Sequence, residues 1–87
     1  MTATTEGAPA LTMFTTPWCG YCARLKSQLA RAGVRFAEVD IEADVDAAER
    51  VMSANGGNQT VPTLLFADGS TLTNPTIDEV MAKLAAG

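Results

Sequence analysis

The residues of this chain best suited to chemistry are its two cysteines, Cys19 and Cys22, which stand three positions apart in the segment Trp-Cys-Gly-Tyr-Cys. Cysteines at this spacing can form a structural disulfide, provide half of the ligands of a metal site, or act as a redox couple. The chain contains no histidine, which removes histidine general bases and histidine metal ligands from consideration. The cysteine pair is therefore the first candidate for an active site.

Two of these three uses are weakly supported by the sequence. A disulfide that closes so short a loop stabilises a fold by only about 2 kcal/mol in the chain-entropy model, and a reducing cytosol would open it. Structural zinc takes four ligands, so a zinc or iron–sulfur site would need a second chain or an added small thiol. A C-x-x-C motif inside a strand–helix–strand pattern favours a redox couple, and the metal site shared between chains stays open as an alternative.

The two sulfur atoms are predicted to have different environments because a helix begins at this pair. Cys19 is expected at or just before the helix N-terminus, and Cys22 about one turn inside the helix. Unpaired backbone N–H groups and the helix dipole favour an anion at the first position, by about 0.3 to 1 kcal/mol when it is exposed and about 2 kcal/mol when it is partly buried. A charge on Cys22 would lose its hydration. We therefore predict that Cys19 is the nucleophile and Cys22 the resolving thiol.

Seven segments have the pattern of a strand or a helix. Short apolar runs or alternation predict strands at residues 10–15, 35–39, 63–66 and 71–73. Helical spacing of apolar residues predicts three helices. The expected apolar faces are formed by Cys22, Leu25, Leu29 and Ala32 in the first helix, by Val45, Ala48 and Met52 in the second, and by Ile77, Val80, Met81 and Leu84 in the third.

Capping residues set the expected ends of these helices. The first helix is expected over residues 21–32, with Gly33 as its left-handed cap. Asp46 and Glu49 are a candidate capping box for the second helix, which should end at Asn55-Gly56-Gly57. For the third helix, Asn74 is the expected N-cap with Pro75 as the first helical residue, and residues 76–79 offer another box.

The order of these elements, β-α-β-α-β-β-α, predicts an α/β fold with a four-stranded mixed sheet and helices on both faces. A strand, a helix and a second strand require a right-handed parallel crossover, whereas Asp68-Gly69 marks a hairpin turn between antiparallel strands. A length of 87 residues allows one small domain, expected over residues 10–87. Residues 1–9 have no periodicity and are expected to form a disordered tail.

The composition excludes several classes of function. Ten acidic residues against six basic residues give a net charge of −4, so we expect neither nucleic acid nor an anionic membrane surface as a partner. No apolar run is long enough to span a membrane, and the first residues lack the features of a secretion signal. These observations predict a cytoplasmic protein.

The segment from Phe14 to Cys22, followed by Thr60-Val61-Pro62, resembles the glutaredoxin branch of the thioredoxin superfamily. The chain also looks like the mycoredoxins of actinobacteria, through Trp-Cys-Gly-Tyr-Cys, residues 55–58, residues 60–62 and residues 66–75, and the likeness covers about residues 10–86. This resemblance implies a thioredoxin/glutaredoxin-like fold in which the Val61–Pro62 bond is cis and lies beside the active cysteine. It also implies that the backbone of Val61 can pair with an extended substrate, like an added strand.

The function implied by the resemblance is reduction of mixed disulfides between proteins and mycothiol, the thiol that those bacteria use in place of glutathione. Cys19 would attack and Cys22 would resolve, with mycothiol as co-substrate, no bound cofactor and no metal. An NADPH-dependent mycothiol disulfide reductase would be an indirect partner. The residues expected to bind substrate are Trp18, Gly20, Tyr21, Thr60, Val61 and Pro62, with Trp18 and Tyr21 as an aromatic rim.

Three sites differ from the glutaredoxins that use glutathione. Those proteins often carry lysine where Thr16 stands, proline where Gly20 stands, and a Gly-Gly-acidic segment where residues 73–76 stand. A residue other than proline after the active cysteine is common in iron–sulfur glutaredoxins, so a cluster shared between chains remains an alternative function. The other alternative is a thioredoxin-like hydrogen donor that a flavoprotein reductase recharges directly.

The remaining charged residues carry weaker signals. Arg24 and Lys26 lie in the helix that begins at the cysteines and could increase the thiolate population, although cations on a helix usually form a solvated face. Acidic residues alternate from Asp40 onward as in a calcium loop. Val45 stands where that loop needs glycine and Val51 where it needs glutamate, so a calcium site is rejected.

Overall fold

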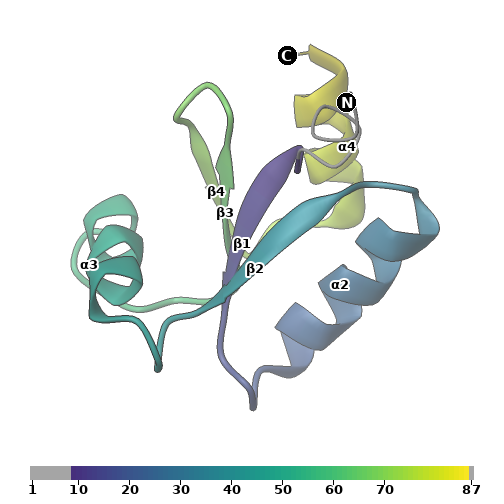
Figure 1. Cartoon of the computed structure of the whole chain (residues 1–87). Coiled ribbons are helices and arrows are strands. Elements are labelled where there is room, and N and C mark those ends of the chain that lie inside the picture. Colours follow the sequence, from purple (N-terminus) through teal and green to yellow (C-terminus); the bar gives the residue numbers. More distant parts are fainter. Residues whose placement is uncertain (1–8, 87) are drawn as a thin grey trace, which may run out of the picture.

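The computed structural model describes residues 9–86, so the tail expected over residues 1–9 lies, apart from Pro9, outside the described residues. The elements follow the predicted order β-α-β-α-β-β-α (Figure 1). They are β1 (Leu11–Thr15), α2 (Gly20–Arg31), β2 (Phe36–Asp40), α3 (Val45–Ala54), β3 (Thr63–Phe66), β4 (Thr71–Thr73) and α4 (Ile77–Ala86). No helix in the described part of the chain is long and apolar enough to cross a membrane.

The four strands form one mixed sheet in the order β2-β1-β3-β4. Strand β1 pairs with β2 in parallel and with β3 antiparallel, and β3 pairs with β4 antiparallel. The predicted hairpin turn is confirmed: Gly69 has a φ of 88°, and the side chain of Asp68 accepts a hydrogen bond of 2.9 Å from the Ser70 N–H. The predicted mixed sheet is therefore confirmed.

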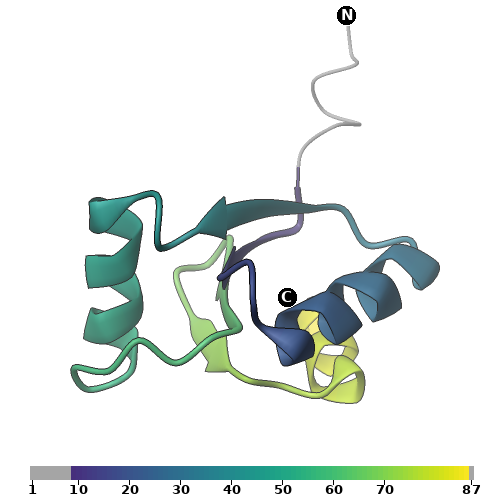
Figure 2. The same ribbon diagram turned by 90° about the horizontal axis from the view of Figure 1, so that it is seen from below.

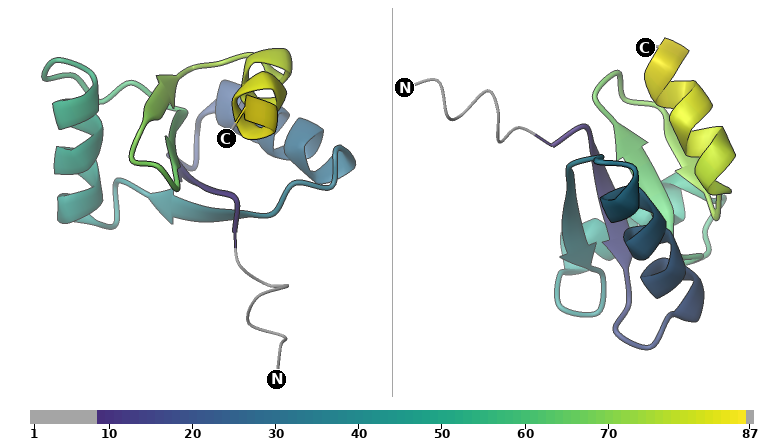
Figure 3. Two further views of the ribbon diagram at one scale, coloured as in Figure 1. Left: turned by 90° about the horizontal axis from the view of Figure 1, so that it is seen from above. Right: turned by 90° about the vertical axis from the view of Figure 1, so that its right-hand side faces the viewer.

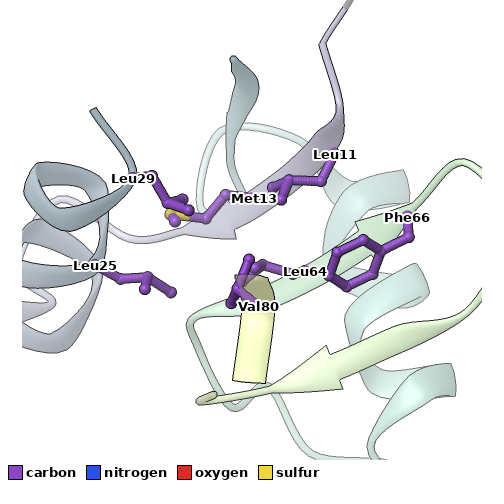
Figure 4. Close-up of a cluster of buried hydrophobic side chains, with 7 residues drawn as sticks. All are labelled: Leu11, Met13, Leu25, Leu29, Leu64, Phe66 and Val80. Carbon is purple, nitrogen blue, oxygen red and sulfur yellow. The ribbon is translucent and has the colours of Figure 1, made fainter. Parts of the chain in front are cut away.

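Helices cover both faces of the sheet, with α2 and α4 on one side and α3 on the other (Figures 2 and 3). Neighbouring residues of β1 supply both cores, because side chains alternate along a strand. Met13 lies in the core beneath α2 and α4, while Phe14 lies in the core beneath α3. The larger core is shown in Figure 4 and consists of Leu11, Met13, Leu25, Leu29, Leu64, Phe66 and Val80.

The first helix is close to its prediction. It starts one residue earlier than expected, at Gly20, and Gly33 follows its C-cap with a φ of 75°, as a left-handed cap requires. Leu25 and Leu29 are buried as expected, whereas Ala32 is exposed because it lies past the last helical turn. The strands expected at residues 10–15 and 35–39 begin one residue later than predicted.

The predicted start of the second helix is wrong. Asp44, rather than Asp46, is its N-cap, and the Asp44 carboxylate accepts a hydrogen bond of 3.1 Å from the Ala47 N–H. Ala47 and Val51 are the helix residues buried against the sheet, and Ala48 packs partly against them. Val45, which was expected on the apolar face, is 74% exposed.

The predicted start of the last helix is also corrected. Asn74 is not an N-cap: it adopts a φ of 48° in the turn after β4, and α4 begins only at Ile77. The box over residues 76–79 is confirmed, because Thr76 Oγ1 accepts from the Glu79 N–H at 3.1 Å and Glu79 Oε1 accepts from the Thr76 N–H at 2.8 Å. Val80 is fully buried, whereas Met81 of the expected stripe is exposed.

Candidate active site

The cysteine pair lies where β1 passes into α2, at the end of the parallel β1–β2 pair. Cys19 is the N-cap of α2 in an extended conformation, and its Sγ accepts a hydrogen bond of 3.1 Å from the Cys22 N–H. A sulfur in this place satisfies one of the free donors of the helix N-terminus. Both cysteines are free thiols. The predicted placement of Cys19 at the helix start and of Cys22 one turn inside is confirmed.

The two sulfur atoms have different environments, because Cys19 caps the start of α2 and Cys22 lies inside its first turn. Cys22 is 1% exposed, and burial, followed by its hydrogen bond with Cys19, raises the pKa of the Cys22 thiol to about 12. A backbone hydrogen bond from Thr16 and the charge of Lys26 act in the opposite direction. Cys22 is therefore protonated at neutral pH, and Cys19 is the sulfur that faces a backbone donor at the start of the helix.

The start of β3 lies directly against the first cysteine. The Val61–Pro62 peptide bond is cis, as the sequence resemblance implied, and the Val61 carbonyl oxygen is 3.9 Å from Cys19 Sγ. The Pro62 carbonyl accepts a hydrogen bond of 2.7 Å from the Asn74 N–H. Within residues 9–86, the Val61 N–H has no hydrogen-bond partner, so it is free to pair with an extended segment of another molecule.

The two aromatic residues beside the cysteines point to different neighbours. Trp18 is 72% exposed, and its Nε1 donates a hydrogen bond of 2.6 Å to the Glu42 carboxylate in the loop after β2. Tyr21 is 67% exposed and lines a groove of about 330 Å³ between α2 and the segment before α4. The groove is lined by Tyr21, Arg24, Leu25, Gln28, Asn74, Pro75, Thr76 and Ile77.

A comparison with known proteins decides the family. The family model named glutaredoxin matches residues 11–71. The chain belongs to the glutaredoxin family. It is 64% identical over 75 residues to a glutaredoxin-like protein of Mycobacterium tuberculosis, with 86% of this chain and 89% of that protein covered. It is 41% identical over 76 residues to mycoredoxin 1 of Corynebacterium glutamicum, with 87% of this chain and 94% of that protein covered.

Solved glutaredoxins have the same fold. The glutaredoxin of Methanosarcina mazei matches with a TM-score of 0.75 at 22% identity, covering 87% of this chain and 78% of that chain. A glutaredoxin of Archaeoglobus fulgidus matches with a TM-score of 0.71 at 25% identity, covering 94% of this chain and 91% of that chain. The predicted thioredoxin/glutaredoxin fold is confirmed, and this glutaredoxin is a thiol–disulfide oxidoreductase that acts on disulfide substrates together with a small thiol.

The structure of this glutaredoxin brings some of the predicted substrate-binding residues together more closely than others. Val61 is in contact with Cys19, whereas Thr60 is exposed and its side chain is held by Asn58 in the loop before Val61. Gly20 is the first residue of α2, and an added Cβ there would meet no atom within 4 Å. The fold therefore does not require glycine after the first cysteine of this glutaredoxin.

A second hollow at the active site was missed by the sequence analysis. It has a volume of about 220 Å³ and lies between α2 and β2. The lining residues are Thr15, Thr16, Pro17, Cys19, Cys22, Ala23, Lys26, Glu38 and Asp40. Two signals could have pointed to it: Lys26 stands one helical turn after Cys22, and Glu38 and Asp40 alternate on the paired strand.

The described residues offer few ligands for a metal. Residues 9–86 contain no group of three or more histidine, cysteine or acidic side chains that could hold a metal ion. A cluster bound by this glutaredoxin would therefore need ligands from a second chain or from small thiols, as the sequence already indicated.

Proposed function

We propose that this glutaredoxin reduces mixed disulfides between proteins and mycothiol, with Cys19 as the attacking thiolate and Cys22 as the resolving thiol. The observation that carries the assignment of roles is the contrast between the two sulfurs. Cys19 Sγ accepts the Cys22 N–H at the start of α2, whereas Cys22 is buried and its thiol pKa is raised to about 12. Only the thiolate attacks a disulfide.

The first step transfers the small thiol to the enzyme. Cys19 Sγ forms a bond to the mycothiol sulfur of the mixed disulfide, the original sulfur–sulfur bond breaks, and the reduced protein leaves as a thiolate that takes up a proton. A second mycothiol can then attack the Cys19 mixed disulfide, which releases mycothiol disulfide and restores the Cys19 thiolate. Alternatively, Cys22 attacks Cys19 Sγ, which forms the Cys19–Cys22 disulfide and releases mycothiol. Mycothiol is thus a co-substrate, and no bound cofactor is needed.

The surroundings of Cys19 support binding of a small thiol that carries sugars. The Val61 backbone and Pro62 lie on one side of the sulfur, and Tyr21 leads into the groove before α4. Arg24, Gln28 and Asn74 add polar groups to that groove, which suit hydroxyl groups of a sugar. The similarity to mycoredoxin 1 over 87% of this chain supports mycothiol over glutathione.

The expected site of action is the cytoplasm. A dithiol that must be reduced to work needs a reducing compartment. An NADPH-dependent mycothiol disulfide reductase would return the oxidised small thiol to the pool.

Coupled turnover of a mycothiol mixed disulfide tests the proposal. NADPH consumption is measured with mycothiol and mycothiol disulfide reductase, and in parallel with glutathione and glutathione reductase. Cys19→Ser should abolish turnover, whereas Cys22→Ser should retain it, because the second mycothiol can resolve the intermediate. Equal loss in both variants, or a preference for glutathione, would contradict the proposal. Activity with thioredoxin reductase alone would favour a thioredoxin-like donor, and visible absorbance of the freshly purified protein would favour an iron–sulfur module.

A further inference from the structure

In the second half-reaction the buried Cys22 thiol must become a thiolate, which burial disfavours. To resolve a mixed disulfide on Cys19, the Cys22 thiol must lose its proton while its side chain is 1% exposed. Burying an isolated thiolate is unfavourable, so a nearby positive charge and a route for the proton are needed. The hollow of about 220 Å³ between α2 and β2 is the place where both can be found, because it is lined by both cysteines.

Lys26 is the cation that faces this hollow. It follows Cys22 by four residues, so the two side chains lie on the same side of α2, one turn apart. Its Nζ is 3.0 Å from Glu38 Oε2 on β2. The same carboxylate oxygen accepts a hydrogen bond of 2.9 Å from Thr15 Oγ1, and Thr15 is buried in β1. Lys26 is therefore paired with a carboxylate on β2 that β1 also contacts, while 37% of its side chain stays exposed.

The Glu38 carboxylate of the hollow is poorly suited to accept the proton. The titratable groups of the hollow are Cys19, Cys22 and Lys26 from α2 and its N-cap, and Glu38 and Asp40 from β2. The hydrogen bond from Lys26 is the largest cause that lowers the pKa of the Glu38 carboxyl, so that it stays ionised. Asp40 Oδ1 already accepts a hydrogen bond of 2.8 Å from the Glu42 N–H.

Water is the better acceptor in this place. Thr16 Oγ1 lines the hollow, is buried, and has no hydrogen-bond partner within the described residues. A buried hydroxyl without a protein partner commonly binds an ordered water, and the hollow is polar and large enough to contain several. Water in this hollow would lie beside both Cys22 and Lys26, which line it.

We propose that Lys26 is a positioning residue for the resolving step: held by Glu38 and Thr15, its ammonium group stabilises the thiolate that Cys22 forms as it attacks Cys19. The inference rests on the proposed role of Cys22. The Cys22 proton passes to water in the hollow, Cys22 Sγ bonds to Cys19 Sγ, and the bond from Cys19 to the small thiol breaks. The small thiol leaves as a thiolate and is protonated by solvent, so the exchange needs no further oxidant or reductant.

Two-phase kinetics with Ellman's reagent separate the two half-reactions without mycothiol. When the reduced protein reacts with one equivalent of the reagent, the first coloured thiolate reports attack by Cys19 and the second reports resolution by Cys22. Lys26→Met should slow the second release roughly fivefold to tenfold at neutral pH and shift its pH profile upward, since one partly screened charge near a sulfur contributes on this order. The first thiolate release should keep its wild-type rate in Lys26→Met. In Lys26→Arg, the second thiolate release should recover most of its wild-type rate.

Lys83→Met is the matched control, because Lys83 pairs with Asp68 at a distance of 3.1 Å in a different part of the surface. An unchanged second release in Lys26→Met, or equal slowing of both releases, overturns the inference while the role of Cys22 stands. Slowing of the second release in Glu38→Gln, with the wild-type rate kept in Lys26→Met, would make Glu38 the base and overturn the inference as well. If the wild-type protein releases only one thiolate, as Cys22→Ser must, the proposed role of Cys22 fails together with the inference.

Discussion

The raised pKa of Cys22 predicts a loss of stability of the reduced protein in mild alkali. Burial raises the pKa of the Cys22 thiol from 9.0 to about 12 in the folded state. Below about pH 9 the thiol is protonated in both states and the effect on stability is absent. Above it, the unfolded chain releases the proton and the folded protein does not, so the free energy of unfolding falls by up to about 1.4 kcal/mol per pH unit. Between about pH 8 and about pH 10 the expected loss is about 1 kcal/mol.

Urea denaturation under a reducing agent measures this loss. The wild-type protein and Cys22→Ser are compared at both pH values, so that the titration of other groups cancels and only the difference in pH dependence is read. In Cys22→Ser, the free energy of unfolding should not show this additional decrease between the two pH values. Cys19→Ser is the matched control and should retain most of it, because burial rather than Cys19 is the largest cause of the shift. The same pH dependence in wild type and Cys22→Ser would refute the assigned environment of Cys22.

Three further predictions follow from other parts of the structure. Iodoacetamide at neutral pH should alkylate Cys19 before Cys22, as measured by peptide mass spectrometry, and equal labelling of both would contradict the asymmetry of the site. Leu29→Ala should lower the free energy of unfolding by about 2 to 5 kcal/mol in urea, because this side chain is fully buried between α2 and the sheet. Thr76→Ala should cost about 1 kcal/mol through the lost cap of α4, and an unchanged urea midpoint would argue against the hydrogen bond to Glu79.

The sequence was sufficient for the strands and the position of the cysteines because local signals there agreed with the packing. An apolar strand, a turn and an amphipathic helix leave only one place for Cys19, and the Asp-Gly turn fixes β3 and β4. Helix starts were less predictable because the sequence offers two caps for the same helix. For α3, Asp44 prevails over Asp46 because the Asp44 carboxylate accepts the Ala47 N–H. For α4, Thr76 prevails over Asn74 because Asn74 still lies in the turn that leaves β4.

The hollow beside Cys22 could be predicted only in part, because its acidic side depends on the strand register. Glu38 reaches the hollow because β2 pairs with β1 so that Met13 is opposite Glu38 and Thr15 opposite Asp40. A shift of one residue would turn the carboxylate to the other face of the sheet. The acidic residues follow the same pattern in the sequence whichever register forms. Only the folded structure therefore shows that Glu38 pairs with Lys26 and is not simply solvated at the end of a strand.

The position of Cys19 at the start of α2, rather than a neighbouring cation, supplies the hydrogen-bond donor that faces this sulfur. At position 16, where many glutaredoxins carry a lysine, this chain has a buried threonine, and within residues 9–86 no hydrogen bond or ion pair joins Cys19 to a cationic side chain. The donor that meets the sulfur is the Cys22 N–H at 3.1 Å, which is fixed by the first turn of α2. Since the effect of a helix terminus is lost within about one turn, a change that displaces the start of α2 should impair the nucleophile more than removal of a surface charge.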